Sequence, residues 1–185
     1  MKELFEAVRA NDAARVESLV ASDPTLAIFA AAMTGDLTKL EALLTGNRSL
    51  VTAVSPDGWT ALHLAAFFGQ EGAARALLNK GASTKTRSTN PMNNLPIHAA
   101  AAGKHTAIVK LLLEHGTPAN AQQQVGWTAL HAAAQHGDVD MAQVLVLNGA
   151  DVSARADNQQ RPIDLAVLKA HQAMVDYLES NGAAL

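Results

Sequence analysis

The chain has 185 residues, enough for one domain or for one array of small repeated units. Its net charge is −3 with no basic run, which argues against nucleic-acid binding, and it has no cysteine, which excludes disulfides, thiolate catalysis and cysteine-based zinc sites. No stretch of about 18 apolar residues is present, and the first residues do not form a signal peptide, so we expect a cytoplasmic protein without a membrane span.

One short pattern recurs along the chain. The hexapeptide GWTALH occurs at Gly58–His63 and again at Gly126–His131, and the related LPIHAA lies between them at Leu95–Ala100. Similar segments extend the series in both directions at intervals of roughly 34 residues. In chain order, the anchor residues are Phe5, Phe29, His63, His98, His131 and Asp164. Phe5 stands closer to Phe29 than this interval, so the first unit lacks a loop of about ten residues.

Each anchor begins a unit of the same kind. A first apolar stretch leads to a glycine, and a second stretch with Leu or Val at three- and four-residue spacing leads to another, as in Gly69–Gly81 and Gly137–Gly149. This pattern predicts a helix, a tight turn, a second helix and a loop. A unit of this size cannot bury its own apolar face, so the units should stack and share one continuous core.

The hexapeptide spans the end of a loop and the start of the helix that follows it. We expect Gly58 and Gly126 to adopt a positive φ where the loop ends. The next polar residues, Thr60 and Thr128, stand where a helix N-cap belongs, and the histidine three positions later takes the place of Glu in a capping box. In other units, Pro96 and Pro162 occupy the first helical position, where a missing N–H costs little.

These residues resemble the ankyrin repeat, whose pattern is T-P-L-H-x-A-A, a Gly, and then I-V-K-L-L-L-E-H-G-A. The resemblance covers essentially the whole chain and implies an all-α repeat solenoid of about six helix pairs with projecting hairpin loops. It divides the single domain 1–185 into an N-terminal cap, four repeats and a C-terminal cap, and two capped ends predict a monomer. The boundaries are 1–24 for the first cap, 25–57, 58–91, 92–125 and 126–158 for the repeats, and 159–185 for the last cap.

The chain departs from this pattern in the third full repeat and at its end. Lys104 stands where the pattern has Gly, with Gly103 one place early, so we expect a strained or shifted turn. The loop 82–94 is two residues longer than its counterparts, and insertions in a solenoid usually lie on the binding face. In the final unit, Gln159 and Ala170 replace the usual glycines, which is typical of a cap.

The candidate sites of chemistry have structural explanations. His63, His98 and His131 could be stacked metal ligands, but helix capping explains their spacing, and successive repeats lie about 10 Å apart, too far for one zinc ion. Around Gly103–Thr106 the residues lack the other features of a phosphate-binding loop. We therefore predict no catalytic residue, no cofactor and no metal, and assign structural roles to Thr60, His63, His98, Thr128 and His131.

The positions of the aromatic residues indicate where a partner would bind. Phe5 and Phe29 take the histidine place and are expected in the core, whereas the resemblance places other side chains on the concave groove or on the loop tips. The predicted partner-binding residues are Trp59, Phe67, Phe68, Met92, Asn94, Trp127, Gln135 and His136. Two alternatives stay open: one of the adjacent phenylalanines turns back between units, or the tryptophans pack on neighbouring loops. Aromatic residues dominate the binding energy of protein interfaces.

Three functions remain to be compared. The first is a non-catalytic protein–protein interaction module that binds a partner through its concave groove and hairpin loops. The second is an enzyme with an unrecognised site, which would need converging titratable groups that the sequence does not show. The third, a special case of the first, is a dedicated inhibitor or chaperone-like regulatory subunit of an enzyme. Fold resemblance alone does not decide between them.

Overall fold

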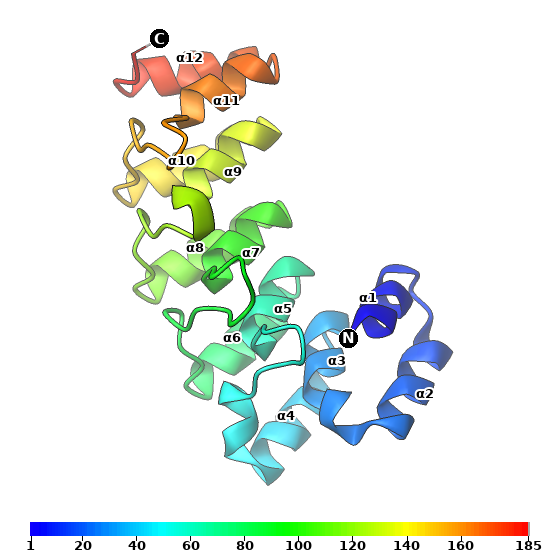
Figure 1. Cartoon of the computed structure of the whole chain (residues 1–185). Coiled ribbons are helices and arrows are strands. Elements are labelled where there is room, and N and C mark those ends of the chain that lie inside the picture. Colours follow the sequence, from blue (N-terminus) through cyan, green and yellow to red (C-terminus); the bar gives the residue numbers. More distant parts are fainter. Residues whose placement is uncertain (185) are drawn as a thin grey trace.

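The computed structural model describes residues 1–184, and this part of the chain is helical, with no extended strand. The prediction of an all-α repeat solenoid of six helix pairs is confirmed (Figure 1). The helices are α1 Lys2–Arg9, α2 Ala13–Ser22, α3 Ala27–Thr34, α4 Leu37–Gly46, α5 Ala61–Phe67, α6 Glu71–Asn79, α7 Pro96–Ala102, α8 Thr106–Glu114, α9 Ala129–His136, α10 Val139–Leu147, α11 Pro162–Leu168 and α12 Gln172–Ser180. Three short 3₁₀ turns lie at Pro24–Leu26, Arg48–Thr52 and Gln124–Gly126.

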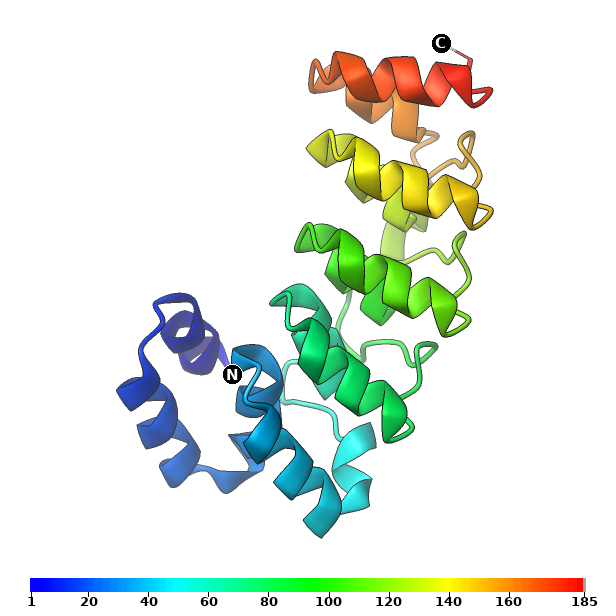
Figure 2. The ribbon, with the colours of Figure 1, turned by 180° about the vertical axis from the view of Figure 1, so that it is seen from behind.

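Five of the pairs form a regular stack. The first helices of these pairs, α3, α5, α7, α9 and α11, make the inner row, and their partners make the outer row, which Figure 2 shows from behind. The pair α1 and α2 does not continue this stack. It lies beside α3 on the side of the inner row and gives the molecule the outline of an L (Figure 1).

Small residues let the inner helices approach closely. Each inner helix of the stack carries fully buried alanines, such as Ala65 and Ala66 in α5 and Ala100 and Ala101 in α7. Larger side chains from the outer row, including Leu77, fill the space behind them. The buried residues form one cluster that runs along the chain, as expected for units that share a core.

The hairpin loops begin and end as predicted. Gly58 and Gly126 have φ values of 85° and 73°, and a Cβ on Gly58 would lie 2.6 Å from the backbone nitrogen of Asn90. Successive loops are tied to each other by backbone hydrogen bonds. The Thr89 N–H donates to the Gly58 carbonyl (2.9 Å), and the Asp157 N–H donates to the Val125 carbonyl (3.0 Å). The loops therefore form a continuous edge rather than independent projections.

The departures from the repeat pattern place other residues in the left-handed region. Lys104 has a φ of 63° and Gly103 a φ of −77°, so the predicted shift of this turn is confirmed. Gly103 is required one place early because a Cβ there would lie 2.4 Å from the Phe67 carbonyl oxygen. In the last unit, Gln159 and Ala170 also have positive φ values, 65° and 56°.

Candidate functional site

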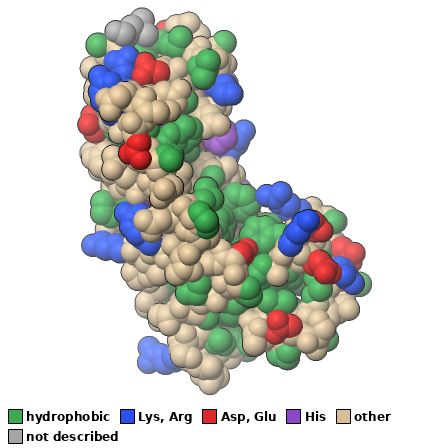
Figure 3. Space-filling view, viewed as in Figure 1, with side chains coloured by type: hydrophobic (Ala, Val, Ile, Leu, Met, Phe, Trp, Pro, Cys, Tyr) green, Lys and Arg blue, Asp and Glu red, His purple; other side chains and the backbone are tan. Residues whose placement is uncertain are grey.

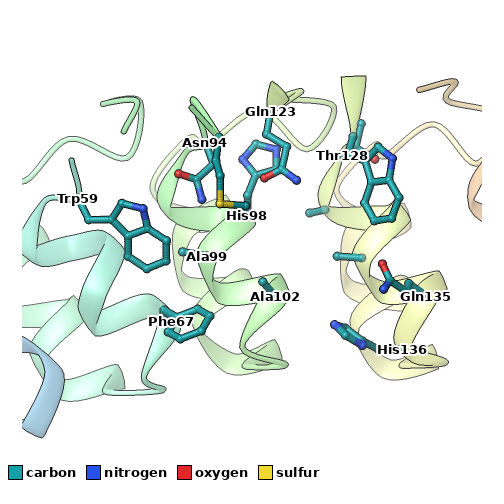
Figure 4. Close-up of a pocket in the computed structure, with 14 residues that line it drawn as sticks. Trp59, Phe67, Asn94, His98, Ala99, Ala102, Gln123, Thr128, Gln135 and His136 are labelled. Carbon is teal, nitrogen blue, oxygen red and sulfur yellow. The ribbon is translucent and has the colours of Figure 1, made fainter. Parts of the chain in front are cut away.

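A groove of about 440 Å³ runs along the inner row between the second and fourth repeats. Trp59 and Phe67 lie on one side and Gln135 and His136 on the other, with small residues such as Ala99 and Ala102 between them (Figure 4). Trp127 also lines the groove. Figure 3 shows hydrophobic side chains gathered in the angle between the stack and the α1–α2 pair. The lining residues are Trp59, Phe67, Met92, Asn94, His98, Ala99, Ala102, Gln123, Trp127, Thr128, Ala129, Ala132, Gln135 and His136.

Buried histidines at the starts of α5, α7 and α9 hold this wall in place. His63 Nε2 donates to the Asn94 carbonyl (3.0 Å), since a carbonyl can only accept. Its Nδ1 then accepts, from the Thr60 hydroxyl (2.8 Å). The rings of His98 and His131 repeat the arrangement with the carbonyls of Ala121 (2.8 Å) and Gln160 (3.1 Å). Each histidine thus ties the start of its own helix to the loop of the next unit.

The same environment keeps these rings neutral. Burial lowers the pKa of His63 and of His98 to about 4, although the hydrogen bond of each ring to a carbonyl acts in the opposite direction. Burial also lowers the pKa of His131. A proton on Nδ1 would face backbone N–H groups, since the Leu95 N–H donates to His98 Nδ1 (3.0 Å). The three rings are therefore structural at neutral pH.

The two tryptophans lie against these histidines. Trp127 stacks on His131 with ring centroids 5.8 Å apart and an angle of 23° between the planes, and Trp59 lies 6.0 Å from His63. Both tryptophans are half-buried, so each keeps part of its ring free toward the groove. The buried ring beneath each indole fixes its orientation, which reduces the entropy that binding would cost.

Phe67 and Phe68 point in different directions. Phe67 lines the groove, but Phe68 faces a second cavity of about 380 Å³ between α5 and the N-terminal pair, with Val16 and Met33 on its other walls. This corresponds to the alternative in which one of the adjacent phenylalanines turns away from the groove. In this conformation Phe5 lies against Phe68, with ring centroids 5.2 Å apart, so Phe68 faces the N-terminal pair and its contact with a partner stays a prediction.

Phe5 itself does not take the core position expected for it. It is half-buried and lies 6.2 Å from Trp59 and 6.4 Å from Phe67 between ring centroids, whereas Phe29 is buried as predicted, with 4% exposed. The four side chains Phe5, Trp59, Phe67 and Phe68 form what we call the aromatic cluster. The short first unit was the signal in the sequence, because a pair without its loop has no hairpin to set its place in the stack.

Asn94 occupies the slot equivalent to the two tryptophans, but it is 2% exposed. The expectation that a partner contacts this side chain is therefore corrected. The longer loop folds over it, with the Asn94 N–H donating to the Ser88 hydroxyl (3.0 Å) and the Ser88 N–H donating to the Asn94 carbonyl (2.8 Å). By contrast, Met92 at the tip of that loop is 45% exposed.

The far end of the groove is polar. Gln135 and His136 line it at the end of α9, and both are half-buried. Burial lowers the pKa of His136, and the nearby charge of Lys104 acts in the same direction. The Gln135 carbonyl accepts a hydrogen bond from His171 Nε2 (3.2 Å), which fixes this end against the last helix pair. The groove therefore runs from apolar to polar toward the C-terminus.

Among residues 1–184, no group of three or more His, Asp or Glu side chains is arranged to hold a metal ion. No helix in this part of the chain is both long and apolar enough to cross a membrane.

A family model described as ankyrin repeats (three copies) matches residues 4–88 and 97–185. The chain belongs to the ankyrin-repeat family. Ankyrin repeats are in general protein-interaction modules and are typically non-catalytic. The two matched segments leave out only a few residues at the N-terminus and the end of the long loop before α7, so the resemblance seen in the repeated hexapeptide extends over the whole stack.

Several curated proteins share this repeat region. The chain is 31% identical over 143 residues to a transient receptor potential cation channel subfamily A member 1 homolog of Caenorhabditis elegans, covering 77% of this chain and 12% of that protein. It is 33% identical over 141 residues to the tyrosine-protein kinase Shark of Drosophila melanogaster, covering 75% of this chain and 14% of that protein. Protein phosphatase 1 regulatory subunit 12A of Mus musculus is 33% identical over 106 residues, 57% of this chain and 10% of that protein. The chain thus spans a small part of each relative.

Proposed function

We propose that this ankyrin-repeat protein is a non-catalytic interaction module that binds a partner protein in its concave groove. One observation carries the proposal: the groove of about 440 Å³ is walled by two tryptophans and a phenylalanine that keep exposed surface, over a floor of alanines. Trp, Phe and Met are enriched at protein interfaces, and buried aromatic anchors supply most of the binding energy. An exposed apolar surface of this kind marks an interaction site.

The proposal assigns direct partner contacts to Trp59, Phe67, Trp127, Gln135 and His136 in the groove and to Met92 at the loop tip. The histidines beneath them are positioning residues, since each one holds the start of a helix and the next loop together. The division into two caps, 1–24 and 159–185, and four repeats is part of the same proposal, as is a free protein that is monomeric. Burial lowers the pKa of His63, His98 and His131, so these rings are neutral at neutral pH and hold the fold rather than transfer protons.

A second candidate is a dedicated regulatory subunit of an enzyme. The observation that favours it is the similarity to a protein whose name states that it is a regulatory subunit of protein phosphatase 1. Both candidates use the same groove and differ in the partner. Stoichiometric addition of the purified chain would change the activity of a captured enzyme if it is a regulatory subunit, and would leave that activity unchanged if it is a module that only brings proteins together.

The test is capture from a lysate of the native host by the tagged chain. The wild type is compared with the Phe67→Ala/Trp127→Ala variant and with Leu147→Ala, a control at the exposed end of outer helix α10, where the side chain is 85% exposed. Loss of one aromatic anchor weakens binding by about 2 kcal/mol, roughly thirtyfold. We expect a protein that the wild type and the control retain and that the groove variant loses. Equal capture by all three would contradict the assignment of the groove, provided that circular dichroism shows each variant folded.

A further inference from the structure

The N-terminal helix α1 covers part of the groove wall. Its Phe5 contacts three aromatic side chains of the stack, with ring centroids 5.2 to 6.4 Å away. Its Arg9 lies with the guanidinium carbon 5.6 Å from the centre of the Phe67 ring, the arrangement of a cation–π contact. One helix of this chain therefore already occupies aromatic surface that the proposed function gives to a partner.

The α1–α2 pair is held less firmly than the other pairs. Only Leu4 and Ala7 of α1 are buried and no residue of α2 is, whereas α3 buries every residue from Ala27 to Met33. Cavities of about 380 and 220 Å³ separate the pair from α3, α4 and α5. A third, of about 360 Å³, lies between α1 and Asp57, the residue before the second repeat. Elements with few buried contacts open at low free energy, so α1 can leave its place while the stack stays folded.

We propose that α1 is a displaceable occupant of the aromatic cluster, and that the surface beneath it binds an amphipathic helix of a partner that presents an aromatic residue and an arginine four residues later. Residues four apart lie on one face of a helix, and α1 presents Phe5 and Arg9 in this way. The partner helix replaces α1 on Trp59, Phe67 and Phe68. The inference deepens the proposed function and rests on it for the existence of a partner.

The chemistry of the occupant follows from the surface. Trp59, Phe67 and Phe68 offer ring faces and edges to an aromatic side chain, and the face of Phe67 attracts a guanidinium. In an extended peptide, residues four apart lie about 13 Å from each other along the chain, whereas in α1 both Phe5 and Arg9 lie against Phe67. A helix with this i, i+4 pair fits the surface that α1 now covers.

The first test uses the fluorescence of Trp59 in the full chain. The sequence has two tryptophans, so a Trp127→Phe background leaves Trp59 as the only indole. Two proteins are compared, one with this change alone and one that also carries Phe5→Ala. The probe is a peptide of residues 1–12, MKELFEAVRAND, with an amidated C-terminus. The control is the same peptide with alanine in the Phe5 position.

We expect the peptide to change Trp59 emission saturably in both proteins, with a midpoint at least about tenfold lower in the Phe5→Ala protein, because the tethered α1 no longer competes. The control peptide should produce no saturable change. The inference is overturned if the peptide has no effect on either protein, or if the two midpoints are equal.

Hydrogen exchange on the unmodified chain gives an independent answer. Backbone amides within and just after α1, such as those of Ala10 and Asp12, donate to carbonyls of the same helix. They should exchange much faster than the helical amides of α5 and α7, at a rate that denaturant at low concentration does not change. Protection of α1 equal to that of α5 would show a fixed cap and would overturn the inference without any variant.

Capture of a partner separates this inference from the proposed function. If the captured partner uses the surface beneath α1, the Phe5→Ala chain retains more of it than the wild type at equal concentration. If the wild type and the Phe5→Ala chain capture equal amounts of the partner and the groove variant captures none, the displacement of α1 is overturned and the proposed function is supported. A successful peptide titration with no partner captured by any chain supports the displaceable helix and contradicts the proposed function.

Discussion

At the scale of single residues, the fold depends on a few side chains that satisfy the backbone. The histidine at the start of an inner helix accepts a hydrogen bond from its own N-cap residue and donates one to the next loop. One side chain thus caps the helix and also joins two successive units. Where the pattern is broken, the reason is steric. Gly103 is needed for the close approach of the Phe67 carbonyl, and the left-handed position then falls on Lys104.

This explanation predicts opposite effects for two adjacent substitutions. Lys104→Gly should stabilise the protein by about 1 kcal/mol, because a left-handed residue with a Cβ costs more than the added entropy of glycine. Gly103→Ala should destabilise it by about 1–3 kcal/mol, because the new Cβ would lie 2.4 Å from a carbonyl oxygen. Thermal unfolding of both variants would measure this. A decrease in Tm for Lys104→Gly would contradict the explanation.

The buried histidines predict sensitivity to acid. In the folded state, the pKa of His63 and of His98 is about 4, whereas the unfolded chain has the ordinary value of 6.5. Below pH 6.5 the unfolded state binds protons that the folded state does not, so stability is complete above pH 6.5 and is lost as the pH falls toward 4. The slope should be about 1.4 kcal/mol per pH unit for each histidine.

Urea unfolding at pH 7, 6 and 5 measures that slope. In a folded His98→Gln variant, which cannot bind the proton at this position, the slope should be smaller by about 1.4 kcal/mol per pH unit. Stability that stays flat from pH 7 to pH 5, or a slope that His98→Gln leaves unchanged, would show that these rings titrate in the folded protein as they do in the unfolded chain.

At the scale of the helices, the last pair has a different role from the first. The pair α11 and α12 buries residues against α9 and α10, among them Ile163, Leu165 and Met174, each at most 4% exposed. The pair α1 and α2 buries little and lies beside the stack. The two ends are thus both helix pairs, but only the C-terminal pair continues the core of the repeats.

Removal of residues 159–185 should therefore damage the protein. It would expose the parts of α9 and α10 that pack against α11 and α12. We expect aggregation or loss of cooperative unfolding, measured by size-exclusion chromatography and by urea titration. A truncated protein that stays monomeric and equally stable would show that 159–185 is not a cap.

At the scale of the whole molecule, the sequence predicted the features that repeat. The period, the helix pairs and the positive φ of Gly58 follow from sequence patterns that recur in successive units. The features that could not be predicted each occur only once in the chain. The position of α1 depends on contacts of Phe5 with residues more than fifty positions away in the sequence. No pattern within the first unit predicts these contacts. The burial of Asn94 depends on how the longer loop folds back through Ser88.

The central claim is that a partner occupies the groove, and site-specific crosslinking tests it most directly. The chain has no cysteine, so one introduced cysteine can carry a photoreactive group at a single position. Ala102→Cys places it on the groove floor at the end of α7, and Lys110→Cys places it at an exposed position on outer helix α8 of the same repeat. The account predicts that the captured partner crosslinks from position 102 and not from position 110. Crosslinking from position 110 alone, or equally from both, would contradict it.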